Sequence, residues 1–250
     1  MARTISLLYH DVVFAGAHAS SGFRSADADR YKIDEARFRA HLDAIAARVQ
    51  PGPQLFTFDD GGASARRVGH LLAERGWRGV FFVPTNFIGT DGFVTSSDVR
   101  TLAAEGHAIG SHSCSHPLRM AALSHARLLQ EWVDSRRVLA DILGRPVSIA
   151  SIPGGYYSTA VAATAAEAGY TELFTSEPVA TAWCVDDLRV QGRYSVLQTT
   201  SAEVVAALAA GDRLPRLRQF AYWNLKKVLK RAGGEYWLRF RKSYLRLRTQ

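Results

Sequence analysis

Two short polar stretches of this sequence contain residue types that could carry out chemistry. Residues 56–61 read FTFDDG and place two adjacent carboxylates after an apolar, β-prone run. Residues 112–117 read HSCSHP and place two imidazoles four residues apart after a second such run. Two histidines and one carboxylate are a sufficient ligand set for a divalent metal with open coordination positions. A second carboxylate could accept a proton from a water molecule that the metal activates.

Each stretch also has a simpler interpretation. Asp59-Asp60-Gly61 is typical of a turn that ends a strand, and a single histidine is more often structural than a ligand. Two histidines at ligand spacing favour the metal site. On one helical turn His112 and His116 would share a face, and the following proline favours a tight turn or a helix start. Strand alternation would turn Asp59 and Asp60 to opposite faces, which predicts different roles for them.

The rest of the chain alternates between strand and helix patterns. We expect strands over residues 5–12, 55–58, 79–83, 107–110, 148–152, 172–175 and 188–196, and helices over residues 34–49, 63–75, 96–105, 124–143 and 158–168. Such alternation is typical of parallel strands with helical crossovers. About seven units suit an α/β barrel, whose chemistry lies at the carboxyl ends of the strands. The polar stretches fall at such ends, and residues 14–32 form a long loop that could be a substrate wall.

Length and charge bound the organisation of the chain. A chain of 250 residues fits one large α/β domain. The net charge of +8 is uneven, because residues 211–250 sum to +10 and the remainder to −2. The first ten residues do not resemble a secretory signal, no run approaches the roughly 20 apolar residues of a membrane span, and two cysteines do not make a disulfide scaffold. We therefore expect a cytoplasmic protein.

The basic C-terminal region predicts two amphipathic helices, over residues 214–231 and 236–248. In the second, Trp237, Phe240, Tyr244 and Leu247 recur at helical spacing among arginines and a lysine. A cationic helix with an aromatic face is attracted to an anionic membrane surface. Alternatively, the apolar faces could cap the barrel while the charges are solvated. Nucleic acid is a less favoured partner, because the region has no recognisable reading motif. We expect a catalytic domain over residues 1–200 and a basic helical extension over residues 201–250.

The two polar stretches together, in this order and about fifty residues apart, resemble the NodB-homology polysaccharide deacetylases of carbohydrate esterase family 4. The resemblance covers roughly the first four-fifths of the chain. It implies a distorted (β/α)7 barrel and metal-dependent removal of acetyl groups from sugars. It also implies that Asp59 is the catalytic base and that Asp60, His112 and His116 bind the metal. Zn²⁺ is the default metal for this ligand set, with Co²⁺, Ni²⁺ and Mn²⁺ as alternatives.

The sequence departs from this family at a third motif. The family often has Arg-x-Pro-Tyr where this chain has Ser151-Ile152-Pro153-Gly154, a version similar to that of some sugar deacetylases encoded in polysaccharide gene sets. Gly154 can still offer a backbone N–H to an oxyanion, but Ser151 cannot orient the base by charge. Arg193, near the end of the last strand, could substitute for the missing arginine, and we also include it among the expected substrate-binding residues.

The family's late Leu-x-His motif is also missing, since residues 196–198 read VLQ and no histidine follows. His10, at the end of the first strand, is the best replacement as general acid. It could instead be a supporting residue bonded to Asp11 or to the metal ligands. Tyr156 and Trp183 could stack on a sugar ring or pack structurally. Cys114 could be a further metal ligand, although a packing role is favoured.

The function predicted from these residues and the resemblance is a metal-dependent hydrolase. It would remove the N-acetyl group from an amino sugar in a polysaccharide or a lipid-linked glycan precursor, at the inner face of a membrane. Three alternatives stay open: a deformylase of a lipid-linked aminosugar, a catalytically impaired sugar- or partner-binding protein, and a nucleic-acid binder that uses the basic region.

Overall fold

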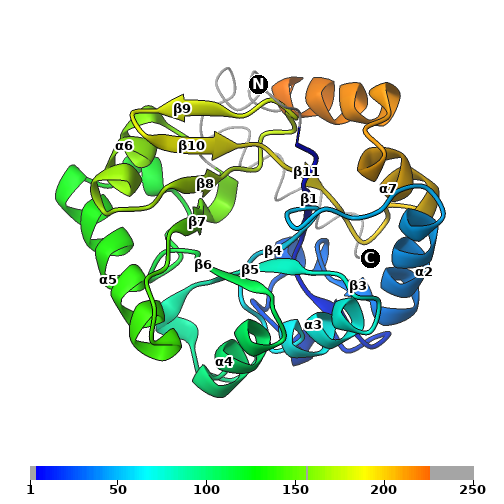
Figure 1. Ribbon diagram of the computed structural model, residues 1–250, viewed down its shortest axis with the longest axis horizontal. Helices are drawn as coiled ribbons and strands as arrows, with labels where there is room; N and C mark the ends of the chain where they lie inside the picture. Colours follow the sequence, from blue (N-terminus) through cyan, green and yellow to red (C-terminus); the bar gives the residue numbers. More distant parts are fainter. Residues whose placement is uncertain (1–3, 156, 226–250) are drawn as a thin grey trace.

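A curled, nine-stranded sheet forms the centre of the molecule, and helices surround it (Figure 1). The computed structural model describes residues 4–155 and 157–225. Along the sheet the order is β11-β1-β4-β5-β6-β7-β8-β10-β9, and every neighbouring pair is parallel except β9 with β10. The strands are β1 (Leu7–Tyr9), β4 (Phe56–Phe58), β5 (Gly79–Val83), β6 (Ala108–Ser111), β7 (Ile149–Ser151), β8 (Glu172–Phe174), β9 (Trp183–Val185), β10 (Leu188–Gln191) and β11 (Tyr194–Ser195). A separate pair joins β2 (Val12–Val13) to β3 (Ile33–Asp34).

Helices connect the parallel strands and cover the outside of the sheet (Figure 1). They are α1 (Ala26–Asp29), α2 (Glu35–Ala46), α3 (Ala65–Ala73), α4 (Ser96–Ala104), α5 (His125–Leu143), α6 (Thr159–Glu167) and α7 (Ala202–Ala209), followed by a helix over residues 213–225. Short polar side chains at the N-caps of α2, α4, α5, α6 and α7 accept hydrogen bonds from first-turn N–H groups. These caps satisfy donors that a helix start otherwise leaves unpaired.

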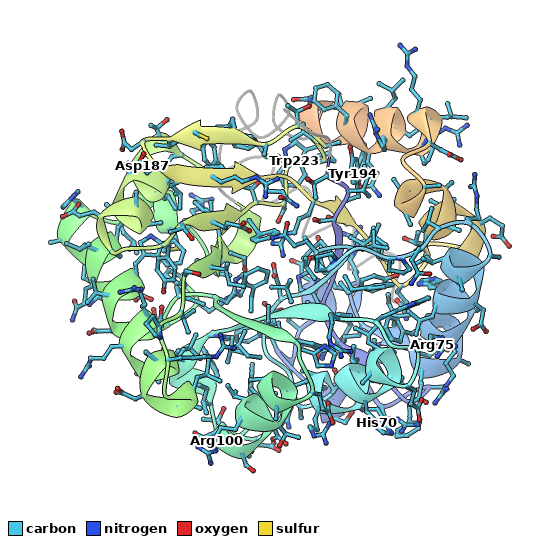
Figure 2. All side chains as sticks on the ribbon, in the orientation of Figure 1. His70, Arg75, Arg100, Asp187, Tyr194 and Trp223 are labelled. Carbon is cyan, nitrogen blue, oxygen red and sulfur yellow. The ribbon has the colours of Figure 1, made fainter. Side chains whose placement is uncertain are left out.

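Apolar side chains from the strands and the inner helix faces form the core, and side chains fill the space that the curled sheet encloses (Figure 2). Leu7, Phe56, Phe81 and Leu173 from four strands are almost fully buried. Because strands packed on both faces need apolar residues throughout, these runs are continuous rather than alternating. Because these strands run parallel, their carboxyl ends all lie at the same end of the barrel, which we call its mouth.

The predicted α/β barrel class is confirmed, and the differences are local. The expected strand over residues 188–196 is two strands, with a bend at Gly192-Arg193 between them. At Gly192 a Cβ atom would lie 2.2 Å from the carbonyl oxygen of Glu177, so only glycine allows this close approach. β9 was not predicted, and the expected long loop over residues 14–32 contains α1 and a short 3₁₀ turn. The bend turns Arg193 into the interior.

The C-terminal elements pack against the barrel. Val205 and Leu208 of α7 belong to the core, and α7 packs on α2. The side chain of Gln219 in the following helix exchanges two hydrogen bonds with the backbone of Ser195 in β11, at 3.1 and 2.9 Å. The division at residue 200 stays a prediction, and the expected helix over residues 236–248 lies outside the described residues. Within the described residues, no helix combines the length and apolar character needed to cross a bilayer.

Candidate active site

Asp60, His112 and His116 bring one donor atom each to a common point at the mouth of the barrel. These atoms all lie within 4.8 Å of one another. Asp60 follows β4, and both histidines follow β6. In residues 4–155 and 157–225 this is the one group of three or more such side chains with metal-binding spacing. Two imidazole nitrogens and one carboxylate oxygen fit Zn²⁺ or a similar divalent ion and leave coordination positions open.

Asp59 lies beside this group and forms a two-pronged ion pair with Arg193. Nη1 and Nη2 of Arg193 donate to Oδ1 and Oδ2 of Asp59 at 2.7 and 2.8 Å. Arg193 has no exposed surface and Asp59 is 4 % exposed. The arginine also donates to the carbonyl oxygen of Thr175 at 3.0 Å, and its guanidinium lies 5.3 Å from the ring centroid of Phe82. With these contacts its orientation is fixed.

This geometry favours one of the two expectations for Arg193. Arg193 has no exposed surface, and both terminal nitrogens of its guanidinium group donate to Asp59, so the side chain is not available to a substrate. The predicted substrate contact is therefore replaced by the other expectation, that Arg193 takes the place of the arginine missing from the third motif. The charge reaches Asp59 from the bend before β11 instead of from β7, because all the strand ends meet at one mouth.

Ser151, at the position of the missing arginine, connects Asp59 with a candidate metal ligand. Its hydroxyl donates to Oδ1 of Asp59 at 3.2 Å and lies 2.5 Å from Nδ1 of His112. The carbonyl oxygen of Ser151 lies 3.2 Å from the same Nδ1. A proton on Nδ1 that is donated to Ser151 leaves the lone pair of Nε2 for a metal. Sequence reasoning missed this role, since no local pattern announces a contact between residues so far apart.

The two adjacent carboxylates face the same imidazole, which corrects the argument from strand alternation. β4 ends at Phe58, and Asp60 has a left-handed backbone with a φ of 72°. Nε2 of His112 therefore lies 3.9 Å from Asp59 and 3.4 Å from Asp60. Alternation applies only within a strand, and the reversal of φ at Asp60 ends it. The two carboxylates differ in their partners rather than in the face they occupy.

The two histidines meet through a loop and not on a helical turn, so the helical geometry, one of those that the sequence suggested, is corrected. β6 ends at Ser111, and no helix includes residues 112–116. Ser113 and His116 both have a positive φ, of 62° and 53°. The imidazole centroids of His112 and His116 lie 4.9 Å apart. The spacing of four residues indicated the meeting correctly, but the backbone reaches it by another route.

The charges around the site keep both carboxylates ionised. Burial alone would raise the pKa of Asp59, but the charge of Arg193, with a contribution from His112, lowers it below the ordinary value. Burial likewise opposes ionisation of Asp60, yet His10 and hydrogen bonds from His112 and His116 hold its pKa well below the ordinary value. A depressed pKa favours the form that accepts protons or binds cations.

His10, which directly follows β1, lies near these carboxylates. It is partly buried, and its ring contacts that of Tyr31, with 4.5 Å between centroids and 40° between the ring planes. Its charge lowers the pKa of Asp60, while within the described chain its buried Nδ1 has no hydrogen-bond partner. Asp11 accepts hydrogen bonds from the hydroxyls of Ser21 and Ser64. The structure thus brings His10 to the mouth of the site, and its role as general acid stays a prediction.

The other predicted site residues have mixed outcomes. Gly154 is exposed, with a φ of 65°, in a turn directly after β7, and its oxyanion role stays a prediction. Trp183 donates from Nε1 to the hydroxyl of Tyr157 at 3.2 Å and packs against the core. Cys114 is buried, outside the metal-ligand group, with Thr85 as a neighbour, which agrees with packing. Tyr156 lies outside the described residues.

An aromatic residue that sequence reasoning did not single out stands near the third motif. A Cβ atom at Gly155 would lie 3.3 Å from the ring of Trp223 and 2.9 Å from Ser176. Gly155 follows β7 and Ser176 follows β8, so Trp223 reaches the same mouth from the C-terminal helix (Figure 2). The sequence places Trp223 in an amphipathic helix and gives no signal of where that helix docks.

Comparison with known proteins identifies relatives of one kind. A family profile described as polysaccharide deacetylase matches residues 48–173, about half of the chain. A curated relative from Bacillus subtilis, named "Putative polysaccharide deacetylase YxkH", is 27% identical over 165 residues, which are 66% of this chain and 57% of the relative. The chain thus spans little more than half the length of that relative.

Solved structures share the fold at low sequence identity. BC0361, a polysaccharide deacetylase from Bacillus cereus, has a TM-score of 0.69 and 17% identity, covering 83% of this chain and 69% of that one. IcaB from Ammonifex degensii has a TM-score of 0.65 and 20% identity, covering 84% of this chain and 98% of that one. These likenesses establish the architecture as a whole.

Removing the positive end of the Asp59–Arg193 pair should destabilise the protein strongly. We expect Arg193→Gln to lower the free energy of unfolding by about 3–5 kcal/mol, because it leaves a buried carboxylate without its counter-charge. Asp59→Asn combined with Arg193→Gln should restore part of this loss. Urea unfolding followed by circular dichroism measures both effects. The control Arg189→Gln removes a partly exposed pair with Glu172 and should cost about 1 kcal/mol or less. An equal cost for both single variants would contradict the prediction.

Proposed function

Because the chain belongs to the polysaccharide deacetylase family, we propose that it hydrolyses the N-acetyl group of an amino sugar in a polysaccharide or a lipid-linked glycan precursor. The observation that carries the proposal is the position of Asp59. Its carboxylate is kept ionised by the charge of Arg193 and lies next to the group formed by Asp60, His112 and His116. A proton acceptor beside a metal-binding group is the arrangement that amide hydrolysis by water requires.

Asp60, His112 and His116 would hold a divalent metal, with Zn²⁺ as the first candidate. Their donor atoms already converge, and their nitrogen and oxygen set is one that zinc accepts. When bound, such an ion polarises a carbonyl group and makes water more acidic. The hydrogen bond between Ser151 and Nδ1 of His112 orients this ligand, as partners of metal-binding histidines commonly do.

Asp59 would take the proton from the attacking water. Its lowered pKa keeps the carboxylate available at neutral pH, and Arg193 fixes its orientation from the buried side. The backbone N–H of Gly154 would donate to the oxyanion that forms at the carbonyl carbon. Its position directly after β7, at the same mouth as the acid and base groups, supports this role.

His10 would donate a proton to the nitrogen of the departing amine. Two features support this assignment: the charge of His10 acts on Asp60 of the metal-binding group, and the ring of Tyr31 contacts its imidazole, with 4.5 Å between centroids. A protonated imidazole is a suitable acid near neutral pH. An amine is a poor leaving group unless its nitrogen is protonated, so the reaction needs such a donor.

The helix over residues 213–225 supports a role for the membrane surface in this function. It has five exposed large apolar side chains, 46–61% exposed: Leu214, Leu217, Phe220, Tyr222 and Leu225. Arg213, Arg216 and Arg218 lie on the same helix. Apolar side chains that insert beside arginines are suited to an anionic lipid surface. Since the cytoplasmic leaflet is the anionic one, the proposal places the enzyme at that face, with Trp223 connecting the helix to the mouth of the barrel.

Replacing Asp59 and replacing His112 should have different effects, because the first is the proposed proton acceptor and the second a proposed metal ligand. Asp59→Asn should keep the metal but lower acetate release by about 10²- to 10⁴-fold, because the proton acceptor is lost. His112→Ala should lose the metal as well. Metal content by mass spectrometry and acetate release from N-acetylglucosamine oligomers and a lipid-linked N-acetyl sugar test this. A wild-type protein that holds metal but releases acetate from none of them, while releasing formate from N-formyl counterparts, would replace acetyl by formyl in the proposal.

The role of His10 can be separated from general damage by changing the leaving group. His10→Gln should lower deacetylation of an N-acetyl sugar by about 10²-fold or more. It should have little effect on hydrolysis of 4-nitrophenyl acetate, whose leaving group departs without protonation. Steady-state kinetics of both substrates measure the difference. An equal loss on the two substrates would assign His10 a supporting role at the metal ligands instead.

Surface binding by the C-terminal helix should depend on its exposed leucines. We expect the protein to sediment with vesicles that contain phosphatidylglycerol and not with vesicles of phosphatidylcholine alone. Leu214→Ser with Leu217→Ser should weaken binding at least tenfold, because each side chain contributes about 1.5–3 kcal/mol when buried. Val133→Ser, at an exposed apolar position of α5, is the matched control. Unchanged sedimentation of the double variant would show that this helix only caps the barrel.

A further inference from the structure

The loop over residues 112–116 has an unusual backbone for a segment that supplies two metal ligands. It is not helical, and Ser113 and His116 adopt left-handed conformations without being glycine. Such conformations cost free energy and persist only where surrounding contacts impose them. The contacts that impose this one therefore decide where the imidazole of His116 lies relative to Asp60.

Glu131 in α5 provides three of those contacts. One carboxylate oxygen accepts hydrogen bonds from the backbone N–H groups of Cys114, at 3.0 Å, and Ser115, at 2.8 Å. The other oxygen accepts from the hydroxyl of Ser115 at 2.6 Å. Glu131 is 3% exposed, and Arg127, a largely exposed side chain, approaches it to 3.5 Å. A buried carboxylate with these partners is compensated chiefly by the loop itself.

The opposite side of the loop is also tied, so the loop is clamped between two elements. Backbone N–H groups of Thr85 and Asn86 donate to the carbonyl oxygens of Ser113 and Cys114, both at 3.1 Å. One helical turn beyond Glu131, the hydroxyl of Ser135 lies 2.5 Å from that of Ser111, at the end of β6. Residues four apart on a helix share a face. α5 therefore presents two polar side chains to this region, Glu131 to the ligand loop and Ser135 to the end of β6.

We propose that Glu131 is a positioning residue, which fixes the loop so that His116 meets Asp60 and His112 before any metal arrives. A carboxylate is needed because one oxygen must accept from two adjacent N–H groups while the other accepts from a hydroxyl. An amide could keep these contacts only if the hydroxyl of Ser115 became the acceptor, and its neutral oxygen would bind the two N–H groups less strongly than a carboxylate does. The inference rests on the proposed metal site, since it explains how the ligands of that site are preorganised.

The test measures metal affinity of the metal-free protein, which does not depend on substrate or turnover. Zn²⁺ dissociation constants come from competition with a chromophoric chelator, for wild type, Glu131→Gln and Asp134→Asn. Asp134 is the control, a partly exposed carboxylate of α5 paired with Arg137. We expect Glu131→Gln to weaken zinc binding by about tenfold or more, as losses of supporting partners around metal ligands commonly do, with no change for the control. Visible absorption of the Co²⁺ forms should differ between wild type and Glu131→Gln.

Ser115→Ala keeps the test decisive if Glu131→Gln does not fold. It removes only the hydroxyl bond to Glu131 and should weaken zinc binding in the same direction by a smaller factor. Variants that unfold at lower temperature in the metal-free form but bind zinc as tightly as wild type would overturn the inference and leave Glu131 a structural residue. Failure of the wild type to bind zinc or Co²⁺ would instead overturn the proposed metal site, and this inference with it.

Discussion

The buried pair of Asp59 and Arg193 is the interaction on which the rest of the site depends. Two charges removed from water are unfavourable unless their geometry is well matched and their remaining donors are satisfied. Here both carboxylate oxygens and both terminal nitrogens take part, and Thr175 accepts from the remaining Nε. Asp59 follows β4, whereas Arg193 lies at the bend between β10 and β11. The pair can therefore form only when the sheet has curled far enough to bring its late strands to the mouth.

Moving the arginine to that bend changes what β7 can contribute. With the charge supplied from elsewhere, a small hydroxyl at Ser151 can bridge Asp59 and His112. The proton acceptor and a metal ligand of the proposed mechanism are thus connected through one side chain. Position along the chain is a weak guide to role in a barrel, since any strand end faces the same mouth. The chemical requirement for a positive charge beside Asp59 is the stronger guide.

Much of the fold follows from local sequence, whereas the site follows only in part. The strand at Gly79–Val83 and the helix starts near residues 34 and 124 agree with the prediction, because apolar runs, glycines and capping residues act over a few positions. Arg193 was found by asking what replaces a missing charge. Ser151 and Glu131 were not, because their contacts join residues that are 16 or more positions apart and depend on how the elements pack. Arguments from regular geometry failed where the backbone leaves strand or helix.

Those failures share one physical cause. Asp60, Ser113 and His116 all have left-handed backbones, each of which costs on the order of 1 kcal/mol or more for a residue with a Cβ atom. A local sequence rule assigns the cheapest conformation, so it cannot anticipate residues that are held in a costly one by distant partners. In the ligand loop those partners include the carboxylate of Glu131 and the N–H groups of Thr85 and Asn86. Because the strained residues include two of the three candidate ligands, the packing of α5 and of the turn after β5 against the loop sets the geometry of the site as directly as the ligands do.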